Sequence, residues 1–257
     1  MSKKNQSLRE KLLFLFKHLN IKKDSKIMMH SNAAGVFQFK SSNYNNAVLK
    51  QIFFKNLINV LGSNGLLVLP VYNYDFPKKK PFYYDRHNSQ VGEMGNFFLK
   101  KYNVIRTLNP VFSHAILKNR TIPHLNENIH DCLGKKSFFN YLHKENFKIF
   151  GFCVPTNTMT FIHYVECINN VKYKYNKKFR SFIIKNNKKI DLTIVYNVGK
   201  KKYNYTLKAD KINKAISSLK SYRSLDFGRF HCWTIDSKEV FNSITNMIKK
   251  NKFYLIK

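Results

Sequence analysis

Hydrophobic residues recur at helical spacing in two long segments of the first quarter of the chain. Residues 7–20 and 45–61 each place apolar side chains three or four positions apart, which predicts two helices. Ser7 and Glu10 have the spacing of a capping box at the start of the first helix. Gly62 follows the second helix and is expected to be its C-cap.

Continuous apolar runs at residues 26–30 and 66–71 flank the second of these helices. Runs without polar alternation are typical of strands covered on both faces, as in a parallel sheet, so this segment predicts a βαβ unit. The alternation continues with helices predicted at 95–102, at 136–145 and from about 158, and strands at 112–117 and 148–153. We therefore expect an α/β core over residues 1–170, with a mainly parallel central sheet.

The pattern changes after residue 170 and becomes partly antiparallel. Residues 181–185 and 190–197 flank the turn signal NNKK and predict a hairpin, and residues 202–207 predict a third strand. A helix at 208–220, a strand at 227–235 and a last helix at 236–249 are predicted to follow, the last with a capping box formed by Asp236 and Glu239. Residues 171–257 are expected to pack on the same domain as a smaller, partly antiparallel portion.

The composition is that of a globular protein with a large excess of basic residues. The chain has 257 residues, 44% of them hydrophobic, and a formal net charge of +32. The lysines are spread along the whole chain and no nucleic-acid-binding motif accompanies them, so no dedicated nucleic-acid partner is expected. A nucleic-acid or acidic-surface binding protein nevertheless stays open as an alternative, and anionic small molecules are expected to be attracted.

The sequence lacks the signs of a membrane, secreted or metal-binding protein. No apolar run approaches the roughly 18–20 residues of a membrane span, and the N-terminal segment is amphipathic, so we expect a cytoplasmic protein. The four cysteines have no C-x-x-C pairing and no spacing suited to zinc. We expect neither a metal site nor a disulfide.

His163 and Glu166 are the strongest candidates for catalysis. They lie three residues apart in the segment 157–166 (NTMTFIHYVE), which is expected to be a buried helix. A carboxylate at this spacing reaches one imidazole nitrogen and leaves the other free to accept a proton. The pair follows a predicted strand, and such strand-to-helix turns gather the sites of α/β sheets. The nucleophile is either a protein hydroxyl or thiol, as in a hydrolase, or a group of the substrate.

The turn after the first predicted strand is a second candidate site. Residues 30–35 (HSNAAG) are small or polar, so a ligand can approach the backbone amides closely. The turn has neither the G-x-G-x-x-G pattern of a Rossmann site nor the P-loop pattern.

Four motifs in this order resemble those of the aminoglycoside 3-N-acetyltransferase family. They are the turn at 30–32 (HSN), the segment 62–70 (GSNGLLVLP), the segment 106–113 (RTLNPVFS) and the helix at 157–166. The resemblance covers roughly residues 25–170, with a looser similarity at 226–236. Four motifs in register are far more specific than any one of them.

The resemblance implies a three-layer αβα fold and an N-acetyltransferase that uses acetyl-CoA as acyl donor. It implies that His163, paired with Glu166, deprotonates the acceptor amine. It also implies a set of residues that bind the cofactor, contributed by the first-strand turn and by the segment 106–113: His30, Ser31, Asn32, Gly35, Arg106, Asn109 and Ser113.

The chemistry of an amine acetylation agrees with these residues. A base that removes a proton as the amine attacks contributes about 10²–10⁴-fold in rate. Thr158 and Thr160 are candidates to stabilise the oxyanion. Direct transfer to the amine is the simpler route, and a ping-pong route through Cys153 or Cys167 stays open.

The charge balance guides the choice of acceptor. An aminoglycoside is a polycation, whereas this chain has 14 acidic against 46 basic residues. The balance favours a neutral or anionic amino sugar, such as a nucleotide-linked sugar of a polysaccharide pathway, and an aminoglycoside resistance enzyme is the alternative. Asp75 and Asp131 are the candidates to bind the acceptor, and a homodimer is one assembly that the sequence allows.

Overall fold

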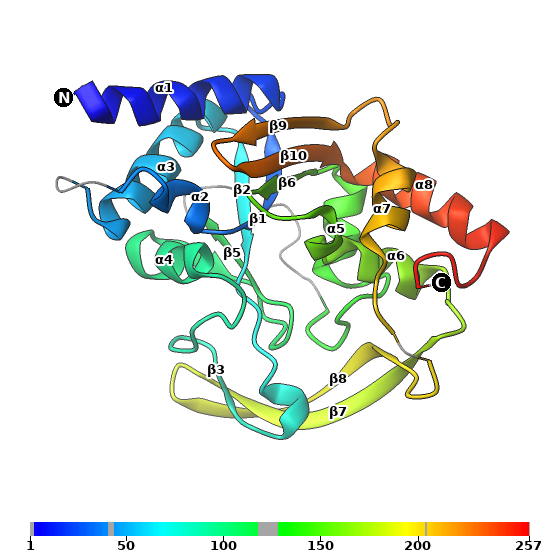
Figure 1. The fold of residues 1–257 in the computed structure, drawn as a ribbon. Coiled ribbons are helices and arrows are strands. Elements are labelled where there is room, and N and C mark those ends of the chain that lie inside the picture. Colours follow the sequence, from blue (N-terminus) through cyan, green and yellow to red (C-terminus); the bar gives the residue numbers. More distant parts are fainter. Residues whose placement is uncertain (1–2, 41–43, 118–127, 204, 257) are drawn as a thin grey trace.

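The protein is described by a computed structural model that covers residues 3–40, 44–117, 128–203 and 205–256, with the side chains of residues 3–7 left out. These residues form a seven-stranded sheet with helices on both faces and a separate three-stranded sheet (Figure 1).

The seven-stranded sheet has the strand order β4-β5-β2-β1-β6-β10-β9. Its strands are β1 (Lys26–Ser31), β2 (Leu66–Pro70), β4 (Val104–Arg106), β5 (His114–Leu117), β6 (Lys148–Phe152), β9 (Arg223–Phe227) and β10 (Phe230–Asp236). The three central strands β2, β1 and β6 are parallel, and every flanking pair is antiparallel. The α/β class is confirmed, but the parallel part is confined to the centre, so the sheet is more mixed than the apolar runs predicted.

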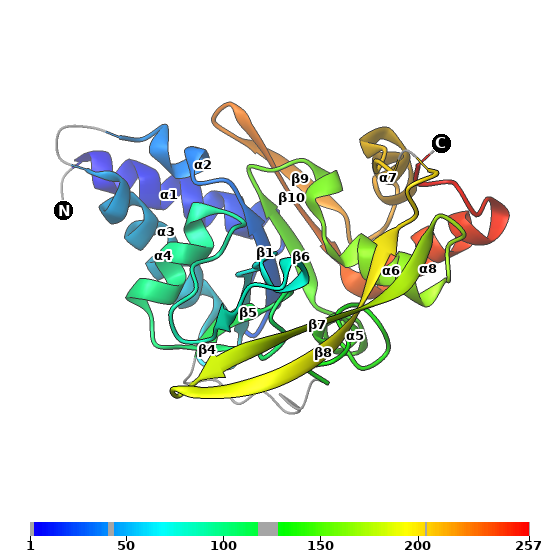
Figure 2. The same cartoon turned by 90° about the horizontal axis from the view of Figure 1, so that it is seen from below.

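Helices form a layer on each face of this sheet (Figure 2). The apolar core on one face includes residues of α1 (Lys3–His18), α2 (Ala34–Phe37), α3 (Asn46–Leu61) and α4 (Glu93–Lys101). The core on the other face includes residues of α5 (Phe138–Lys144), α6 (Phe161–Ile168), α7 (Ala209–Ile216) and α8 (Ser237–Lys250). Ile27 and Met29 of β1 belong to the first core and Met28 to the second, as the period of a strand requires. The three-layer αβα arrangement is thus confirmed.

The βαβ unit is present as β1, α3 and β2. Asn45 caps α3, because its Oδ1 accepts hydrogen bonds from the amides of Ala47 and Val48, both at 3.0 Å. Gly62 ends the helix with φ of 64°, a conformation that favours glycine. The predicted C-cap is confirmed.

The two predicted capping boxes are wrong. Helix α1 begins at Lys3, so Ser7 lies inside the helix and its side chain is outside the described residues. Asp236 precedes α8, but its Oδ1 accepts a hydrogen bond from Lys148 Nζ at 2.7 Å instead of capping the helix. Glu239 instead accepts a hydrogen bond from the Ser221 amide at 3.1 Å. Asp236 and Glu239 therefore bond to residues distant in sequence and not to the backbone of α8.

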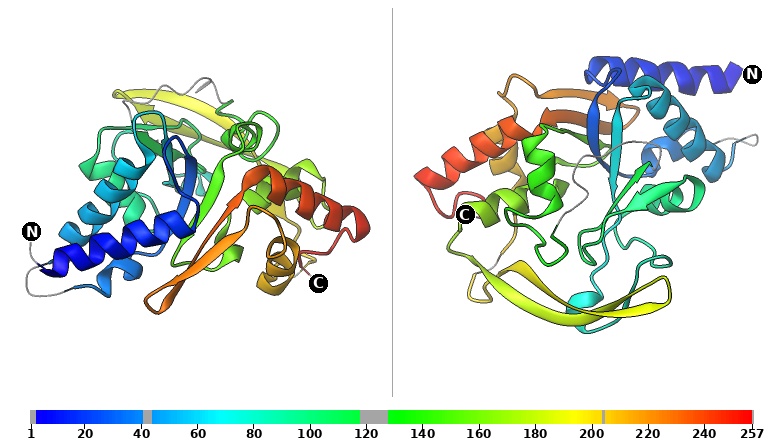
Figure 3. Two further views of the ribbon diagram at one scale, coloured as in Figure 1. Left: turned by 90° about the horizontal axis from the view of Figure 1, so that it is seen from above. Right: turned by 180° about the vertical axis from the view of Figure 1, so that it is seen from behind.

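The predicted hairpin is longer than the sequence indicated and lies across one end of the central sheet (Figures 1 and 3). It consists of β7 (Lys174–Lys185) and β8 (Lys188–Gly199), joined by Asn186 and Asn187 with φ of 50° and 59°. The strand predicted at 202–207 is wrong, since the described residues there form no strand. The third strand is instead β3 (Phe82–Tyr83), which pairs in parallel with β7 after the short helix η1 (Phe76–Lys78).

The single strand predicted at 227–235 is also wrong, because Gly228, with φ of 62°, turns the chain and makes the hairpin β9–β10. Strand β10 pairs with β6 and extends the central sheet. The division of the chain at residue 170 remains a prediction.

Candidate functional site

The helix expected to hold the general base is α6, and it starts at the carboxyl end of a central strand. The turn η2 (Thr156–Thr158) follows β6 and leads into α6. The apolar residues of α6 are buried in the core between the sheet and α8. His163 and Glu166 lie one turn apart on this helix, as their spacing predicted.

His163 and Glu166 are in direct contact. Nδ1 of His163 lies 2.7 Å from Oε2 of Glu166. The Glu166 side chain is fully buried, whereas the His163 side chain is 27% exposed. A hydrogen bond from Nδ1 to the carboxylate places the proton on Nδ1 and leaves the lone pair on Nε2. The arrangement can therefore accept a proton from a ligand beside α6.

A buried lysine joins this pair, and sequence reasoning missed it. Lys174 Nζ lies 2.5 Å from Glu166 Oε2 and 3.1 Å from His163 Nδ1, and its side chain is only 4% exposed. Lys174 is the first residue of β7, beyond the helix and its following turn. Among the many lysines of the chain, no local signal distinguished it.

Two tyrosines complete the contacts of the carboxylate and were also missed. Tyr173 donates its hydroxyl to Glu166 Oε1 at 2.9 Å. The Tyr205 hydroxyl lies 3.0 Å from Glu166 Oε2 and 3.1 Å from His163 Nδ1. The cation of Lys174 also lies 4.7 Å from the centroid of the Tyr205 ring. We call these five residues the base cluster: His163, Glu166, Tyr173, Lys174 and Tyr205.

The surroundings of the base cluster lower the pKa values of both Glu166 and His163. Burial would raise the pKa of Glu166, but the hydrogen bond from His163 and the charge of Lys174 outweigh it and lower that pKa to about 2. Burial lowers the pKa of His163, the charge of Lys174 lowers it further, and Glu166 opposes both. Glu166 is therefore ionised at neutral pH, and the neutral form of the imidazole is favoured.

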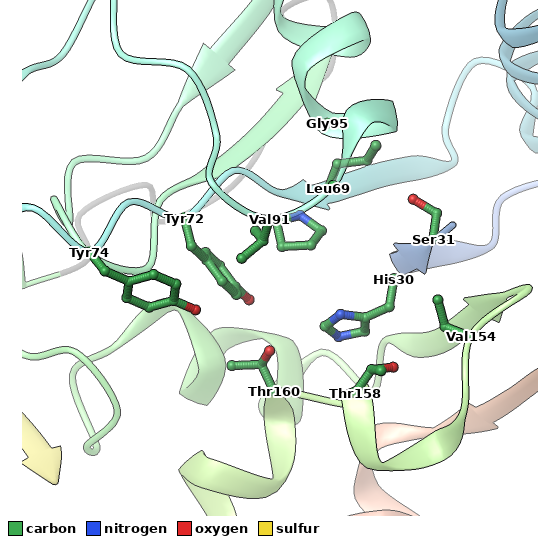
Figure 4. Close-up of a pocket in the computed structure, with 12 residues that line it drawn as sticks. His30, Ser31, Leu69, Tyr72, Tyr74, Val91, Gly95, Val154, Thr158 and Thr160 are labelled. Carbon is green, nitrogen blue, oxygen red and sulfur yellow. The ribbon is translucent and has the colours of Figure 1, made fainter. Parts of the chain in front are cut away.

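A cavity of about 290 Å³ lies at the carboxyl ends of β1 and β2, next to the start of α6. Most of its lining side chains are apolar or aromatic, and a few are polar (Figure 4). The lining residues are His30, Ser31, Leu69, Pro70, Tyr72, Tyr74, Val91, Gly92, Gly95, Val154, Thr158 and Thr160. We call it the strand-end cavity. Of the predicted residues it brings together His30, Ser31, Thr158 and Thr160.

His30 lies in the wall of this cavity, with its ring between Tyr72 and Thr158 (Figure 4). Its Nε2 is buried and has no hydrogen-bond partner among the described residues. Burial lowers the pKa of His30 to about 4, so the imidazole is neutral at pH 7. An orphaned buried donor or acceptor is costly, and a ligand group in the cavity would satisfy it.

The two predicted oxyanion residues face this cavity but differ in their bonding (Figure 4). Thr158 donates its hydroxyl to the carbonyl of Pro155 at 2.6 Å. In Figure 4, Thr160 lies near Tyr72, whose hydroxyl lies 3.2 Å from His114 Nε2. Their role as oxyanion donors remains a prediction, and Thr160 is the better placed because it lies one turn before His163.

The turn after β1, residues 30–35, is stabilised by a hydrogen bond within the turn and by close packing at Gly35. Asn32 accepts the amide of Ala34 on its Oδ1 at 3.0 Å. Gly35 is packed so tightly that a Cβ there would lie 2.3 Å from Cys153 Sγ. Ser31 alone of these residues lines the strand-end cavity beside His30. Cofactor binding by Ser31, Asn32 and Gly35 stays a prediction.

The second segment predicted to bind the cofactor is residues 106–113. Its polar side chains form hydrogen bonds with other groups of the protein. Arg106 donates to Ser113 Oγ at 3.0 Å and to the Val71 carbonyl at 2.9 Å, and burial lowers its pKa to about 10. Asn109 Oδ1 accepts the amide of Phe112 at 2.9 Å. These residues support the loop behind β2 and do not line the strand-end cavity. Their predicted contact with the cofactor is untested.

The predicted acceptor carboxylates lie apart from each other. Asp131 is tied to its own loop, since its oxygens accept the amides of Gly134 at 2.6 Å and Lys136 at 3.0 Å. Asp75 lies 3.8 Å from Lys78 Nζ. Asp131, not Asp75, lines a cavity of about 280 Å³ that also includes Cys167.

This second cavity is lined by three asparagines together with charged and apolar side chains, and it reaches α6 at Cys167, next to Glu166 of the base cluster. Its walls are Asn128, His130, Asp131, Leu133, Gly134, Lys136, Cys167, Asn176, Val195 and Asn197. Thr160, His163 and Cys167 follow the helical spacing that places them on one face of α6. Thr160 lines the strand-end cavity and Cys167 the second one, so His163 lies between them along the helix.

Neither predicted cysteine is an activated thiol. Cys153 is buried, with its Sγ 3.5 Å from Cys232 Sγ, and this contact together with burial raises the pKa of its thiol. Burial raises the pKa of Cys167 to about 11. A nucleophilic cysteine needs a lowered pKa, so these surroundings favour direct transfer over a ping-pong route.

The described residues contain neither a cluster of metal-binding side chains nor a membrane-spanning helix. No group of three or more histidine, cysteine or acidic side chains is placed there to hold a metal ion. No helix within the described ranges has the length and apolar character needed to cross a membrane.

The sequence profile of the aminoglycoside 3-N-acetyltransferase family matches residues 28–249 of the chain. That range includes the base cluster and the lining of the strand-end cavity. Sequence comparison with curated proteins finds no match.

Solved structures of low sequence identity share the fold. YokD from Bacillus subtilis has a TM-score of 0.75 at 14% identity, over 95% of this chain and 93% of that protein. AAC-IIIb in its binary complex with CoASH has a TM-score of 0.77 at 15% identity, over 94% and 96%. AAC-VIa bound to sisomicin has a TM-score of 0.76 at 14% identity, over 94% and 97%.

Proposed function

Because the chain belongs to the aminoglycoside 3-N-acetyltransferase family, we propose that it acetylates an amino sugar by direct transfer, with His163 as the general base and Glu166 orienting it. Membership of the family assigns the reaction class: the protein is an N-acetyltransferase that uses acetyl-CoA. The observation that carries the proposed mechanism is the 2.7 Å contact between His163 Nδ1 and the buried carboxylate of Glu166.

The strand-end cavity suits the reactive end of the donor. Acetyl-CoA supplies an acetyl thioester, an apolar group with one hydrogen-bond-accepting carbonyl. The cavity offers apolar walls and, among them, the hydroxyl of Thr160 and the Nε2 of His30, which has no hydrogen-bond partner in the described part of the chain. We expect these two side chains to hold the carbonyl end and to stabilise negative charge on its oxygen. The net charge of +32 favours the approach of a phosphate-bearing donor.

Each residue of the pair then has a defined task. Nε2 of His163 accepts a proton from the acceptor amine while Nδ1 stays bonded to Glu166. The amine nitrogen bonds to the acetyl carbon, the carbon–sulfur bond breaks, and the proton held by His163 passes to the departing thiolate. The products are the acetylated amine and free CoA, and His163 returns to its neutral form. No acyl-enzyme is required.

The second cavity is the proposed place for the acceptor. It reaches α6 at Cys167, one turn after His163, whereas the strand-end cavity reaches α6 at Thr160, one turn before His163. Asn128, Asn176 and Asn197 provide amide groups that can bind sugar hydroxyls. An acceptor held there would approach His163 along α6 from Cys167, and the donor would approach it from Thr160.

The charges around this site favour a neutral or anionic acceptor, such as a nucleotide-linked amino sugar. Lys174 neutralises Glu166, and the Asp131 oxygens already accept backbone amides. A polycation needs several free carboxylates, and the acidic residues predicted to bind the acceptor do not form such a cluster. An aminoglycoside is the second candidate, favoured by the family to which the chain belongs.

Thiol release from acetyl-CoA tests the proposed acceptor. We expect turnover with nucleotide-linked amino sugars to exceed turnover with gentamicin or tobramycin in kcat/KM. The matched control uses the same sugars with the amine already acetylated, which should give no release. Efficient release with aminoglycosides alone would refute the acceptor class, and release without any amine would indicate a hydrolase.

A further inference from the structure

Lys174 is the member of the base cluster with no place in the reaction described so far. Its ammonium contacts both catalytic candidates, at 2.5 Å from Glu166 Oε2 and 3.1 Å from His163 Nδ1. Its side chain is 4% exposed, although charged lysines are almost never buried unless they are paired. The chain therefore maintains a buried cation directly beside the imidazole.

We propose that Lys174 is a positioning residue of the transfer reaction: its ammonium fixes the Glu166 carboxylate against His163 and opposes the protonation of the imidazole. The inference rests on the proposed role of His163 as the base. Glu166 Oε2 binds both Lys174 and His163, so the lysine defines where the carboxylate lies. A second positive charge on His163 would form about 3 Å from the ammonium, at Nδ1.

The remaining groups around His163 are consistent with this role. Glu166 contacts it from α6, Lys174 from β7 and Tyr205 from the segment before α7, and Cys167 lies one turn further along α6. Burial raises the pKa of Tyr205, so its hydroxyl stays neutral at working pH. Burial and then the charge of Lys174 lower the pKa of His163, and Glu166 is the one group that raises it. Lys174 is thus the only cation that balances Glu166 at the described contacts of the imidazole.

The sign of the effect follows from these charges. With Lys174 replaced by Met, Glu166 remains as an uncompensated anion beside His163 and favours the imidazolium form. The acid limb of the kcat/KM profile should then move to higher pH. The loss at pH 6, relative to each protein's own plateau, should be about 3- to 10-fold.

Three variants separate charge from shape. Lys174→Met removes the ammonium, Lys174→Arg keeps a cation at the site, and Lys172→Met changes an exposed lysine two residues earlier. We expect the acid limb to move only in Lys174→Met and to keep its wild-type position in the other two. A uniform loss of kcat at every pH, with the limb unmoved in Lys174→Met, would overturn the proposal by showing that Lys174 is only structural.

Nuclear magnetic resonance of the histidine side chains provides a readout that is independent of turnover, and its wild-type measurement does not depend on the folding of the Met variant. In the wild-type protein, the signal missing from His163→Asn identifies the His163 ring. We expect it to titrate at lower pH than a free imidazole, and at higher pH in Lys174→Met. A shifted titration without any effect on the kcat/KM limb would contradict His163 as the base while supporting the charge effect of Lys174. An imidazole that titrates like a free one in the wild type would overturn the Lys174 proposal itself.

Discussion

The charge of Glu166 is expected to stabilise the fold by an amount that depends on pH. Its side chain is fully buried, and its partners lower its pKa from the ordinary 4.5 to about 2. One pKa unit corresponds to about 1.4 kcal/mol. The shift therefore represents about 3 kcal/mol of unfolding free energy at pH 7, carried by the contacts with His163 and Lys174.

The direction of the pH dependence follows from the sign of this shift. Because the pKa of the folded state lies below that of the unfolded state, the contribution is complete above the ordinary value of 4.5 and is lost as the pH falls towards about 2. Glu166→Gln should lower the free energy of unfolding by about 3 kcal/mol at pH 7. The difference from the wild type should become smaller as the pH falls below 4.5. Urea unfolding followed by fluorescence of Trp233, the single and fully buried tryptophan, measures it.

Glu145→Gln is the matched control. Glu145 pairs with Lys26 at 2.6 Å, but both side chains are more than a third exposed, so its loss should cost below about 1 kcal/mol. A loss in Glu166→Gln that is equal at pH 3 and pH 7, or no larger than in the control, would refute the charge argument.

Three further changes probe the site and the core. Cys153→Ala should keep the transfer rate, since its thiol is buried against Cys232 and poorly ionised; thiol-release kinetics that fall to background would favour a ping-pong route. Thr160→Val should lower kcat by about 10²-fold with little change in the KM for acetyl-CoA, and steady-state kinetics showing the reverse would make the residue a binding group only. Gly151→Ala would place a Cβ 2.1 Å from the Trp233 ring and should cost about 1–3 kcal/mol in urea unfolding; wild-type stability would contradict the packing.

Local patterns were sufficient for the elements whose causes are local. The unit β1, α3 and β2 could be predicted because its apolar runs, the cap at Asn45 and the turn at Gly62 lie within or next to each element. The contact between His163 and Glu166 is likewise set by the spacing of one helix. The antiparallel flanks of the sheet have the same apolar runs as parallel strands, so the sequence pattern could not tell them apart.

The parts that sequence reasoning missed depend on contacts between distant segments. Lys174 and Tyr205 reach Glu166 from 8 and 39 residues away. Their neighbours in sequence give no reason to single them out. Strand β3 exists only because β7 offers an edge to residues 82–83. The turn at Gly228 between β9 and β10 lies within the segment predicted as one strand, residues 227–235. It was missed because a single glycine is a weak turn signal.

The central claim is that His163 removes the proton from the acceptor amine. Its most direct test compares thiol release from acetyl-CoA by the wild type and by His163→Ala with a nucleotide-linked amino sugar, alongside calorimetric binding of CoA to both. The account predicts a loss of about 10²–10⁴-fold in kcat with unchanged CoA affinity. Wild-type turnover by His163→Ala would contradict it.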